Sequence, residues 1–122
     1  MKFLTALFAF AMITASTFAA DGPIRHIVHF KFKADASKEQ IAKIVEEFAA
    51  LKNKISVVES LEWGTNVSKE GLDKGYDYCW IVTFKNEADR VAYIVHPAHQ
   101  AFVALLKPSL DEALVVDFIP QK

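Results

Sequence analysis

Alternating side chains mark the stretch IRHIVHFKF at residues 24–32. Successive side chains of a β-strand point to opposite faces, so every second residue of this stretch shares a face. One face carries His26, Val28, Phe30 and Phe32. The intervening positions carry basic, histidine and isoleucine side chains. The stretch therefore predicts a strand with one face on the core.

The residues after this strand alternate between helical and extended patterns. Ser37 can cap a helix from Lys38 that includes Leu51, and Gln40 completes a capping box. Further apolar runs and turn residues predict a strand region at 55–63, a strand at 76–84, helices at 87–95 and 97–106, and a last strand at 114–119. This is the ferredoxin-like order, an α+β fold with an antiparallel sheet and helices on one face.

Both faces of the expected strands are apolar. The face that the helices leave uncovered would carry Ile27, Cys79, Ile81, Val115 and Ile119. A single soluble domain seldom exposes such a patch. A second copy packed sheet to sheet would cover it, so we predict a homodimer through the sheet face.

The first 20 residues have the layout of a signal peptide. Lys2 precedes an apolar run from Phe3 to about Ile13, and small and polar residues follow as far as Ala20. The apolar run is too short for a membrane span, which needs about 20 residues. The alternative is a first buried helix. We expect an exported protein, periplasmic or secreted after cleavage near Ala19 or Ala20, with one domain at 21–122.

Composition excludes several classes of partner. The 122-residue chain has a formal net charge of −1, and its basic residues are scattered among acidic ones. No basic stripe indicates nucleic acid, and no second hydrophobic stretch indicates a membrane segment after signal removal. Cys79 is the only cysteine, so no intramolecular disulfide can form. Its apolar neighbours favour a buried thiol over a link between chains.

The run Tyr-Ile-Val-His-Pro-Ala-His-Gln-Ala-Phe at residues 93–102 concentrates the titratable rings. Pro97 is favoured at the first position of a helix, which places His99 in the first turn. The positive end of the helix dipole disfavours a charged imidazole there, so His99 could accept a proton. Tyr93 could donate a hydrogen bond to a developing enolate oxygen. The alternative is a buried core histidine beside a rim tyrosine.

A metal site is the other reading of the histidines. His26 and His29 are three residues apart on a strand, so their side chains point to opposite faces and cannot chelate together. No carboxylate or cysteine joins His96 and His99 at a ligand spacing. His96 precedes proline and is expected to cap the turn. We predict no metal and no cofactor.

Four stretches resemble the stress-responsive dimeric α/β barrel (Dabb) family. They are residues 25–33, residues 75–78 leading to 82–84, the His-Pro-Ala-His run at 96–99, and residues 117–120. The resemblance spans essentially all of residues 21–122 and implies two ferredoxin-like protomers that close a barrel. Most members of the family have no assigned reaction. One plant branch, olivetolic acid cyclase, closes a linear tetraketide by aldol condensation.

The cyclase branch implies a set of site residues. Its general base is the second His of the run and its assisting Tyr lies six residues earlier, which correspond to His99 and Tyr93. It also uses histidines at positions matched by His26 and Tyr78. Trp80 replaces a small aliphatic residue, which predicts a smaller or filled cavity and argues against cyclase activity. The expected pocket comprises His26, Val28, Phe30, Phe48, Tyr78, Trp80 and Phe102.

Two classes of function follow. The first is an exported homodimeric domain that binds a small apolar or carbonyl-bearing molecule without catalysis. The second is a cofactor-free cyclase-like or isomerase-like enzyme that uses His99 as general base and Tyr93 as hydrogen-bond donor. Monooxygenases and haem-degrading enzymes with related barrels are a more distant third. No Gly-rich phosphate loop, paired carboxylates or serine elbow indicates another chemistry.

Overall fold

The structure, a computed structural model, describes residues 22–122. The signal peptide expected at residues 1–20 lies outside this part of the chain. The described elements are, in order, β1 (Ile24–Phe32), α1 (Lys38–Lys54), β2 (Ser60–Thr65), β3 (Tyr78–Phe84), α2 (Glu87–Val95), α3 (Pro97–Leu106), the 3₁₀ turn η1 (Lys107–Ser109) and β4 (Leu110–Phe118). No helix within residues 22–122 combines the length and the apolar character that crossing a membrane requires.

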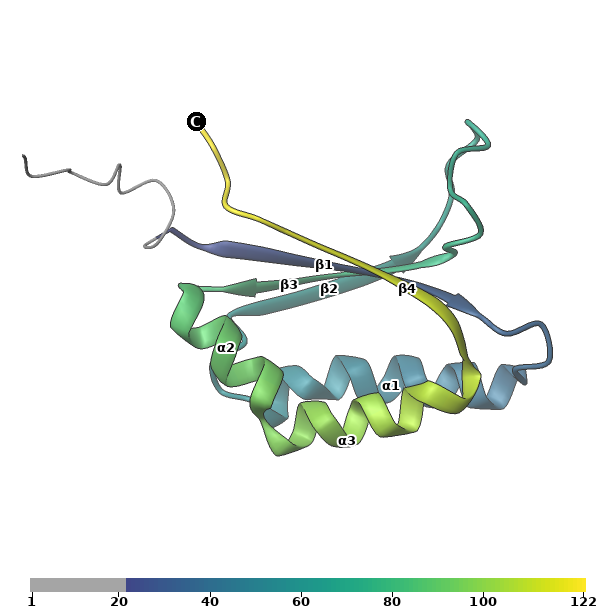
Figure 1. The fold of residues 1–122 in the computed structure, drawn as a ribbon, viewed down its shortest axis with the longest axis horizontal. Coiled ribbons are helices and arrows are strands. Elements are labelled where there is room, and N and C mark those ends of the chain that lie inside the picture. The colour runs from purple at the N-terminus through teal and green to yellow at the C-terminus, as the bar shows by residue number, and fades with distance from the viewer. Residues whose placement is uncertain (1–21) are drawn as a thin grey trace, which may run out of the picture.

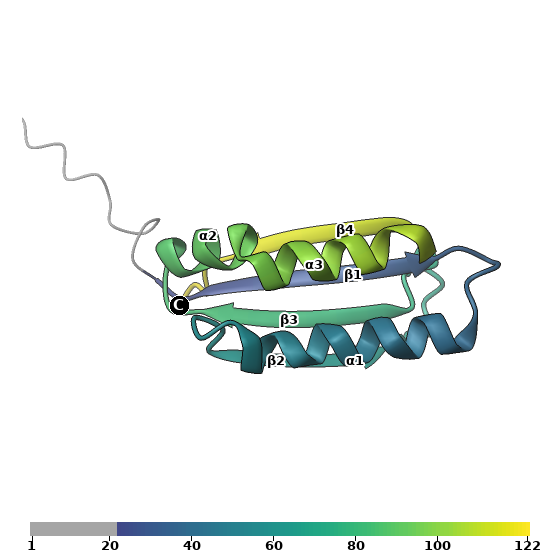
Figure 2. The same ribbon diagram turned by 90° about the horizontal axis from the view of Figure 1, so that it is seen from below.

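The four strands form one antiparallel sheet in the order β2-β3-β1-β4. All three α-helices lie on the same side of this sheet (Figure 1). Seen from below, α1 runs beneath β2 and β3, whereas α2 and α3 run beneath β1 and β4 (Figure 2). The prediction of a ferredoxin-like α+β fold is confirmed.

The helices begin where the local sequence predicts. The Gln40 backbone N–H donates to the Ser37 hydroxyl at 3.1 Å, and the Ser37 N–H donates to the Gln40 side-chain oxygen at 2.8 Å. This reciprocal pair is the predicted capping box. Asn86 caps α2 in a similar way by accepting from the Asp89 N–H at 2.9 Å. Both caps depend on contacts within three residues, which is why they are readable from sequence.

Three strands begin elsewhere than predicted. Ile55 is the C-cap of α1 and packs in the core, so β2 begins only at Ser60. The predicted start of β3 at residue 76 falls in the preceding turn, and the strand begins at Tyr78. β4 begins at Leu110 and pairs with almost the whole of β1. Pro108 ends α3 in a single 3₁₀ turn, and the chain then enters the strand directly.

The face of the sheet without helices differs from the prediction on β4. Val115 pairs with Val28 on β1, so these two side chains share the helix-covered face. Ile119 lies beyond the end of β4. The β4 residues on the helix-free face are instead Leu114, Val116 and Phe118, which join Ile27 and Ile81 there. The expectation for Val115 is wrong. The alternation of a strand shows which residues share a face, but the pairing register decides which of the two faces lies toward the helices.

Stacked aromatic rings fill the core beneath β1 and β3. Trp80 is fully buried and lies parallel to Phe48, with ring centroids 4.7 Å apart and an interplanar angle of 3°. Phe30 packs against the same indole at 4.7 Å. Cys79, on the opposite face, is a free and half-buried cysteine whose thiol pKa is raised by burial.

Candidate active site

A cavity of about 300 Å³ lies between α2 and α3 on one side and β1 and β4 on the other. Its walls are largely apolar, with three polar rings among them. The lining residues are His26, Val28, Phe30, Phe48, Tyr93, Ile94, His99, Phe102, Val103, Leu106, Leu110, Ala113 and Val115. Ile94 and Val115 are 41% and 50% exposed, so the cavity reaches the surface between α2 and the edge strand β4.

The turn between α2 and α3 holds His99 in a defined orientation. Pro97 occupies the first turn of α3, and the His96 Nδ1 accepts the Ala98 backbone N–H at 3.0 Å as the helix cap. This is the capping role expected for His96. The His99 Nδ1 lies 3.1 Å from the Ile94 carbonyl oxygen. A carbonyl can only accept, so Nδ1 carries the proton of a neutral ring and Nε2 remains a free acceptor.

The His99 ring is biased toward its neutral form. Burial lowers its pKa below the usual value of 6.5, the hydrogen bond to Ile94 acts in the opposite direction, and the nearby His26 lowers it further. The sequence-based prediction that His99 favours its neutral form agrees with this lowered pKa. The largest contribution to this shift is removal of the ring from water.

Tyr93 packs against both cavity histidines. Its ring centroid is 4.6 Å from that of His99 and 5.9 Å from that of His26. The residue is 1% exposed, and burial raises the pKa of its hydroxyl well above the usual value. The phenol therefore stays protonated and can donate a hydrogen bond near His99.

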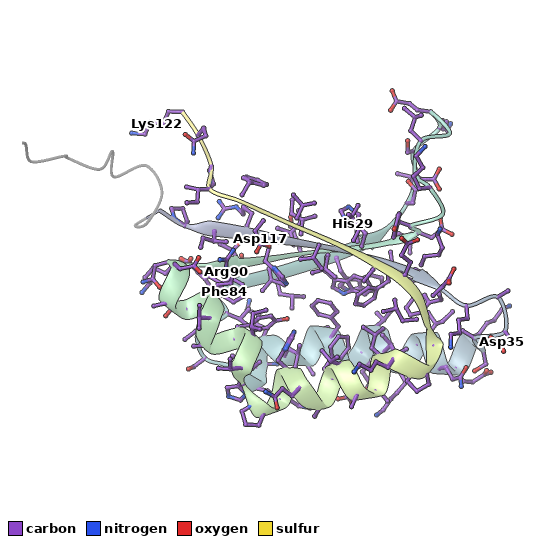
Figure 3. All side chains as sticks on the ribbon, in the orientation of Figure 1. His29, Asp35, Phe84, Arg90, Asp117 and Lys122 are labelled. Atoms are coloured by element: carbon purple, nitrogen blue, oxygen red, sulfur yellow. The ribbon has the colours of Figure 1, made fainter. Side chains whose placement is uncertain are left out.

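A chain of charged groups joins the third polar ring to α2. The His26 Nδ1 lies 2.6 Å from Asp117 Oδ1 on β4, and Asp117 Oδ2 accepts from Arg90 NH1 at 2.7 Å. Arg90 NH2 donates to Glu87 Oε1 at 2.6 Å. Figure 3 shows Arg90 and Asp117 together at the end of the sheet, near Phe84. Sequence reasoning missed Arg90, Glu87 and the pairing role of Asp117, because no local spacing connects positions 87–90 with position 117.

Seven of the nine predicted site residues line the cavity, and Tyr78 and Trp80 do not. The indole of Trp80 lies in the core against Phe30 and Phe48, where it is 0% exposed. Tyr78 borders a separate shallow groove with Val45 and Trp63. The expected filling of the cavity by Trp80 is wrong, because the indole occupies space under the β3 side of the sheet and the cavity lies under β1 and β4. Sequence reasoning also missed Ile94, Ala113 and Val115 as lining residues.

The helix-free face carries a different set of hollows. One of about 660 Å³ lies between the β2–β3 connection and the sheet, and its lining includes His29, Tyr76 and Cys79. His29 points away from the helices (Figure 3), so it is separated from His26 by the sheet. Among residues 22–122, no cluster of three or more His, Cys, Asp or Glu side chains is arranged to hold a metal ion.

The fold and cavity define a class of small α+β domains in which helices and sheet enclose a histidine-bearing pocket. The family model for the Stress responsive A/B Barrel Domain matches residues 24–120. The chain therefore belongs to this family.

Two relatives show how the family varies. The stress-response A/B barrel domain-containing protein HS1 of Arabidopsis thaliana is 37% identical over 101 residues, which cover 83% of this chain and 93% of HS1. Olivetolic acid cyclase of Cannabis sativa is 27% identical over 99 residues, which cover 81% of this chain and 98% of the cyclase. At least one relative is thus an enzyme by name.

One of the similar solved structures is a dimer. A dimeric ferredoxin-like protein of unknown function from Jannaschia is 26% identical, with a TM-score of 0.72, and the match covers 81% of this chain and 100% of that one. Dimeric proteins with this fold are therefore among the structural neighbours.

Proposed function

We propose that this protein binds a small, mainly apolar molecule with a carbonyl oxygen in the cavity beneath β1 and β4. The observation that carries the proposal is the cavity itself, whose apolar walls bring His99, Tyr93 and His26 together. Apolar surface supplies affinity in such sites, and a few placed polar groups orient the ligand. Tyr93 would donate to the carbonyl oxygen.

A second candidate function is proton transfer next to that carbonyl. The free Nε2 of His99 would remove a proton from the carbon adjacent to the carbonyl, and the electron pair of the broken C–H bond would form an enolate. The Tyr93 hydroxyl would stabilise the negative oxygen by a hydrogen bond. Return of the proton from His99 to a different carbon of the delocalised enolate completes an isomerisation. Alternatively, the enolate carbon attacks a second carbonyl, and the alkoxide formed on that carbonyl oxygen takes the proton from His99 to complete an aldol step. The Ile94 contact that fixes the His99 tautomer supports this candidate.

Acetophenone tests both functions, because it combines a ring with an enolisable ketone. We expect it to shift the NMR signals of His99 and Tyr93 in the purified protein, and His99→Ala to weaken binding. His29→Ala is the matched control, since His29 lies on the opposite face of the sheet. Equal loss of binding in both variants, or no shift at cavity residues, would contradict the binding proposal.

Deuterium exchange into the acetophenone methyl group separates binding from catalysis. We expect exchange above the buffer rate with the wild-type protein, and a loss of about two to four orders of magnitude with His99→Ala, the range for general acid–base catalysis. Tyr93→Phe should bind acetophenone and exchange it slowly. Binding without exchange in the wild type would leave the binding function and remove the catalytic one.

The protein is also proposed to form a homodimer through the helix-free sheet face. The β4 residues Leu114, Val116 and Phe118 are 43–49% exposed there, and a dimeric neighbour supports this assembly. We expect Val116→Glu to shift the mass measured by light scattering toward the monomer. Val91→Glu is the control, because Val91 is equally exposed but lies on α2. A dimer that withstands Val116→Glu would place the interface elsewhere.

Export remains a proposal that depends on residues 1–20. Expression of the full chain, followed by N-terminal sequencing of the exported and cell-retained fractions, tests it. We expect an exported product that begins near residue 20 or 21, and retention of an uncleaved chain would contradict the signal peptide.

A further inference from the structure

The contact between His26 and Asp117 needs more than the pairing of their strands to keep the carboxylate in place. His26 and Asp117 are direct partners in the β1–β4 register, which brings the ring and the carboxylate together. β4, however, is the edge strand, and the Asp117 side chain is 25% exposed. A carboxylate with water on one side can rotate away from a single hydrogen-bond donor.

Arg90 supplies the second contact that fixes this carboxylate. Its NH1 binds Asp117 Oδ2 at 2.7 Å, while Oδ1 faces His26 at 2.6 Å. Its NH2 binds Glu87 Oε1 at 2.6 Å, one turn earlier on α2, so the guanidinium is itself held at both ends. The planar guanidinium directs its donors in a fixed geometry that a flexible ammonium does not reproduce.

The consequence reaches the cavity through the tautomer of His26. Because a carboxylate only accepts, the contact places the proton of a neutral His26 on Nδ1 and leaves Nε2 as an acceptor. His26 lines the cavity, and its ring packs against that of Tyr93. If Asp117 turned to solvent, the proton could move to Nε2 and the ring would offer a ligand a donor instead of an acceptor. Partners of this kind commonly fix the tautomer and orientation of a functional histidine.

We propose that Arg90 is a positioning residue for the ligand cavity, which holds Asp117 against His26 and thereby presents the His26 Nε2 as a second acceptor beside His99. This inference rests on the proposed binding function. A ligand that fits both acceptors carries donor hydrogens in addition to its carbonyl, as a hydroxylated aryl ketone does. Arg90 does not itself line the cavity.

Imidazole ¹⁵N spectra of the full chain, recorded at about pH 8, test the proposal without any ligand. His99 and His96 serve as internal references, because their contacts fix opposite tautomers: Nδ1–H for His99 and Nε2–H for His96. We expect His26 to show the Nδ1–H pattern in the wild type. In Arg90→Met a substantial Nε2–H population should appear at His26 alone, and Arg90→Lys, which keeps the charge without the planar pair of donors, should restore the wild-type pattern only in part.

A second variant separates positioning from general loss of stability. Lys43→Met removes an ion pair on α1, in which Lys43 lies 3.1 Å from Glu47, and should leave the His26 tautomer unchanged. Partly exposed ion pairs contribute little to stability, so both variants should fold. Unchanged Nδ1–H at His26 in Arg90→Met would overturn the proposal.

Binding of 2,4-dihydroxyacetophenone, a probe with both donor hydrogens and a carbonyl, provides the functional measurement. We expect Arg90→Met to weaken binding by about five- to tenfold, the scale of one lost hydrogen bond, and Lys43→Met to leave it unchanged. Equal affinity in Arg90→Met and wild type would overturn the role of Arg90 in ligand binding. Absence of binding to the wild type would contradict the proposed function, whereas the tautomer shift would still establish the positioning of His26.

Discussion

Trp80 allows a sharp test of the core next to the cavity. Its side chain is 0% exposed and stacks on Phe48, yet the indole N–H has no hydrogen-bond partner among the described residues. Replacement by phenylalanine removes that N–H and keeps a ring in the stack. The favourable and unfavourable effects of Trp80→Phe therefore nearly cancel.

The size of each effect follows from general values. Loss of the extra ring atoms costs about 1–2 kcal/mol through lost burial and a small cavity. Removal of a buried unpaired donor returns about 1–3 kcal/mol. We expect Trp80→Phe to change the free energy of unfolding by less than about 1 kcal/mol, whereas Trp80→Ala should cost about 3–5 kcal/mol.

Urea denaturation, followed by circular dichroism at one protein concentration, measures these changes; the concentration is fixed because the stability of the proposed dimer would depend on it. Trp63→Phe is the control: Trp63 is 46% exposed, and its replacement should have little effect. Because Trp80 does not line the cavity, Trp80→Phe should also leave acetophenone binding unchanged. A loss of more than about 2.5 kcal/mol in Trp80→Phe would show that the indole N–H is not an unpaired donor in solution.

Two further predictions concern the pH response and the helix cap. Burial lowers the pKa of His99 in the folded protein. Below about pH 6.5 the unfolded chain therefore binds a proton more readily than the folded one, and the free energy of unfolding decreases as the pH decreases. His99→Gln should lose less stability than the wild type between about pH 7.5 and 5.5, as measured by urea midpoints, and equal losses would contradict the assignment. Ser37→Ala should cost about 1 kcal/mol by removing the cap of α1, whereas the exposed Ser56→Ala should cost less than about 0.5 kcal/mol; equal costs would argue against the capping box.

Much of the fold was predictable because its determinants are local. The alternation in residues 24–32 assigns one face of β1 to the core, and burial of His26, Val28 and Phe30 agrees with it. Ser37, Asn86 and His96 cap helices through contacts with residues two or three positions away. The helical spacing after Pro97 likewise places His99 on the same face as Phe102 and Leu106.

The errors arose where two distant segments meet. Val115 faces the helices because it pairs with Val28, which is 87 positions earlier in the chain. The alternating pattern of β4 alone does not specify that pairing register. Trp80 packs under β3 because Phe30 and Phe48 form its site there, which is a property of the assembled core.

The sequence by itself determined the order of elements, the helix caps, the family and the two rings at His99 and Tyr93. Each of these depends on neighbours along the chain or on a motif of a few residues. Only the tertiary structure decided that a cavity of about 300 Å³ remains beside those rings, and that Arg90 and Asp117 reach His26. Strand register and helix packing bring these groups together, and both are set by long-range contacts that no local pattern encodes.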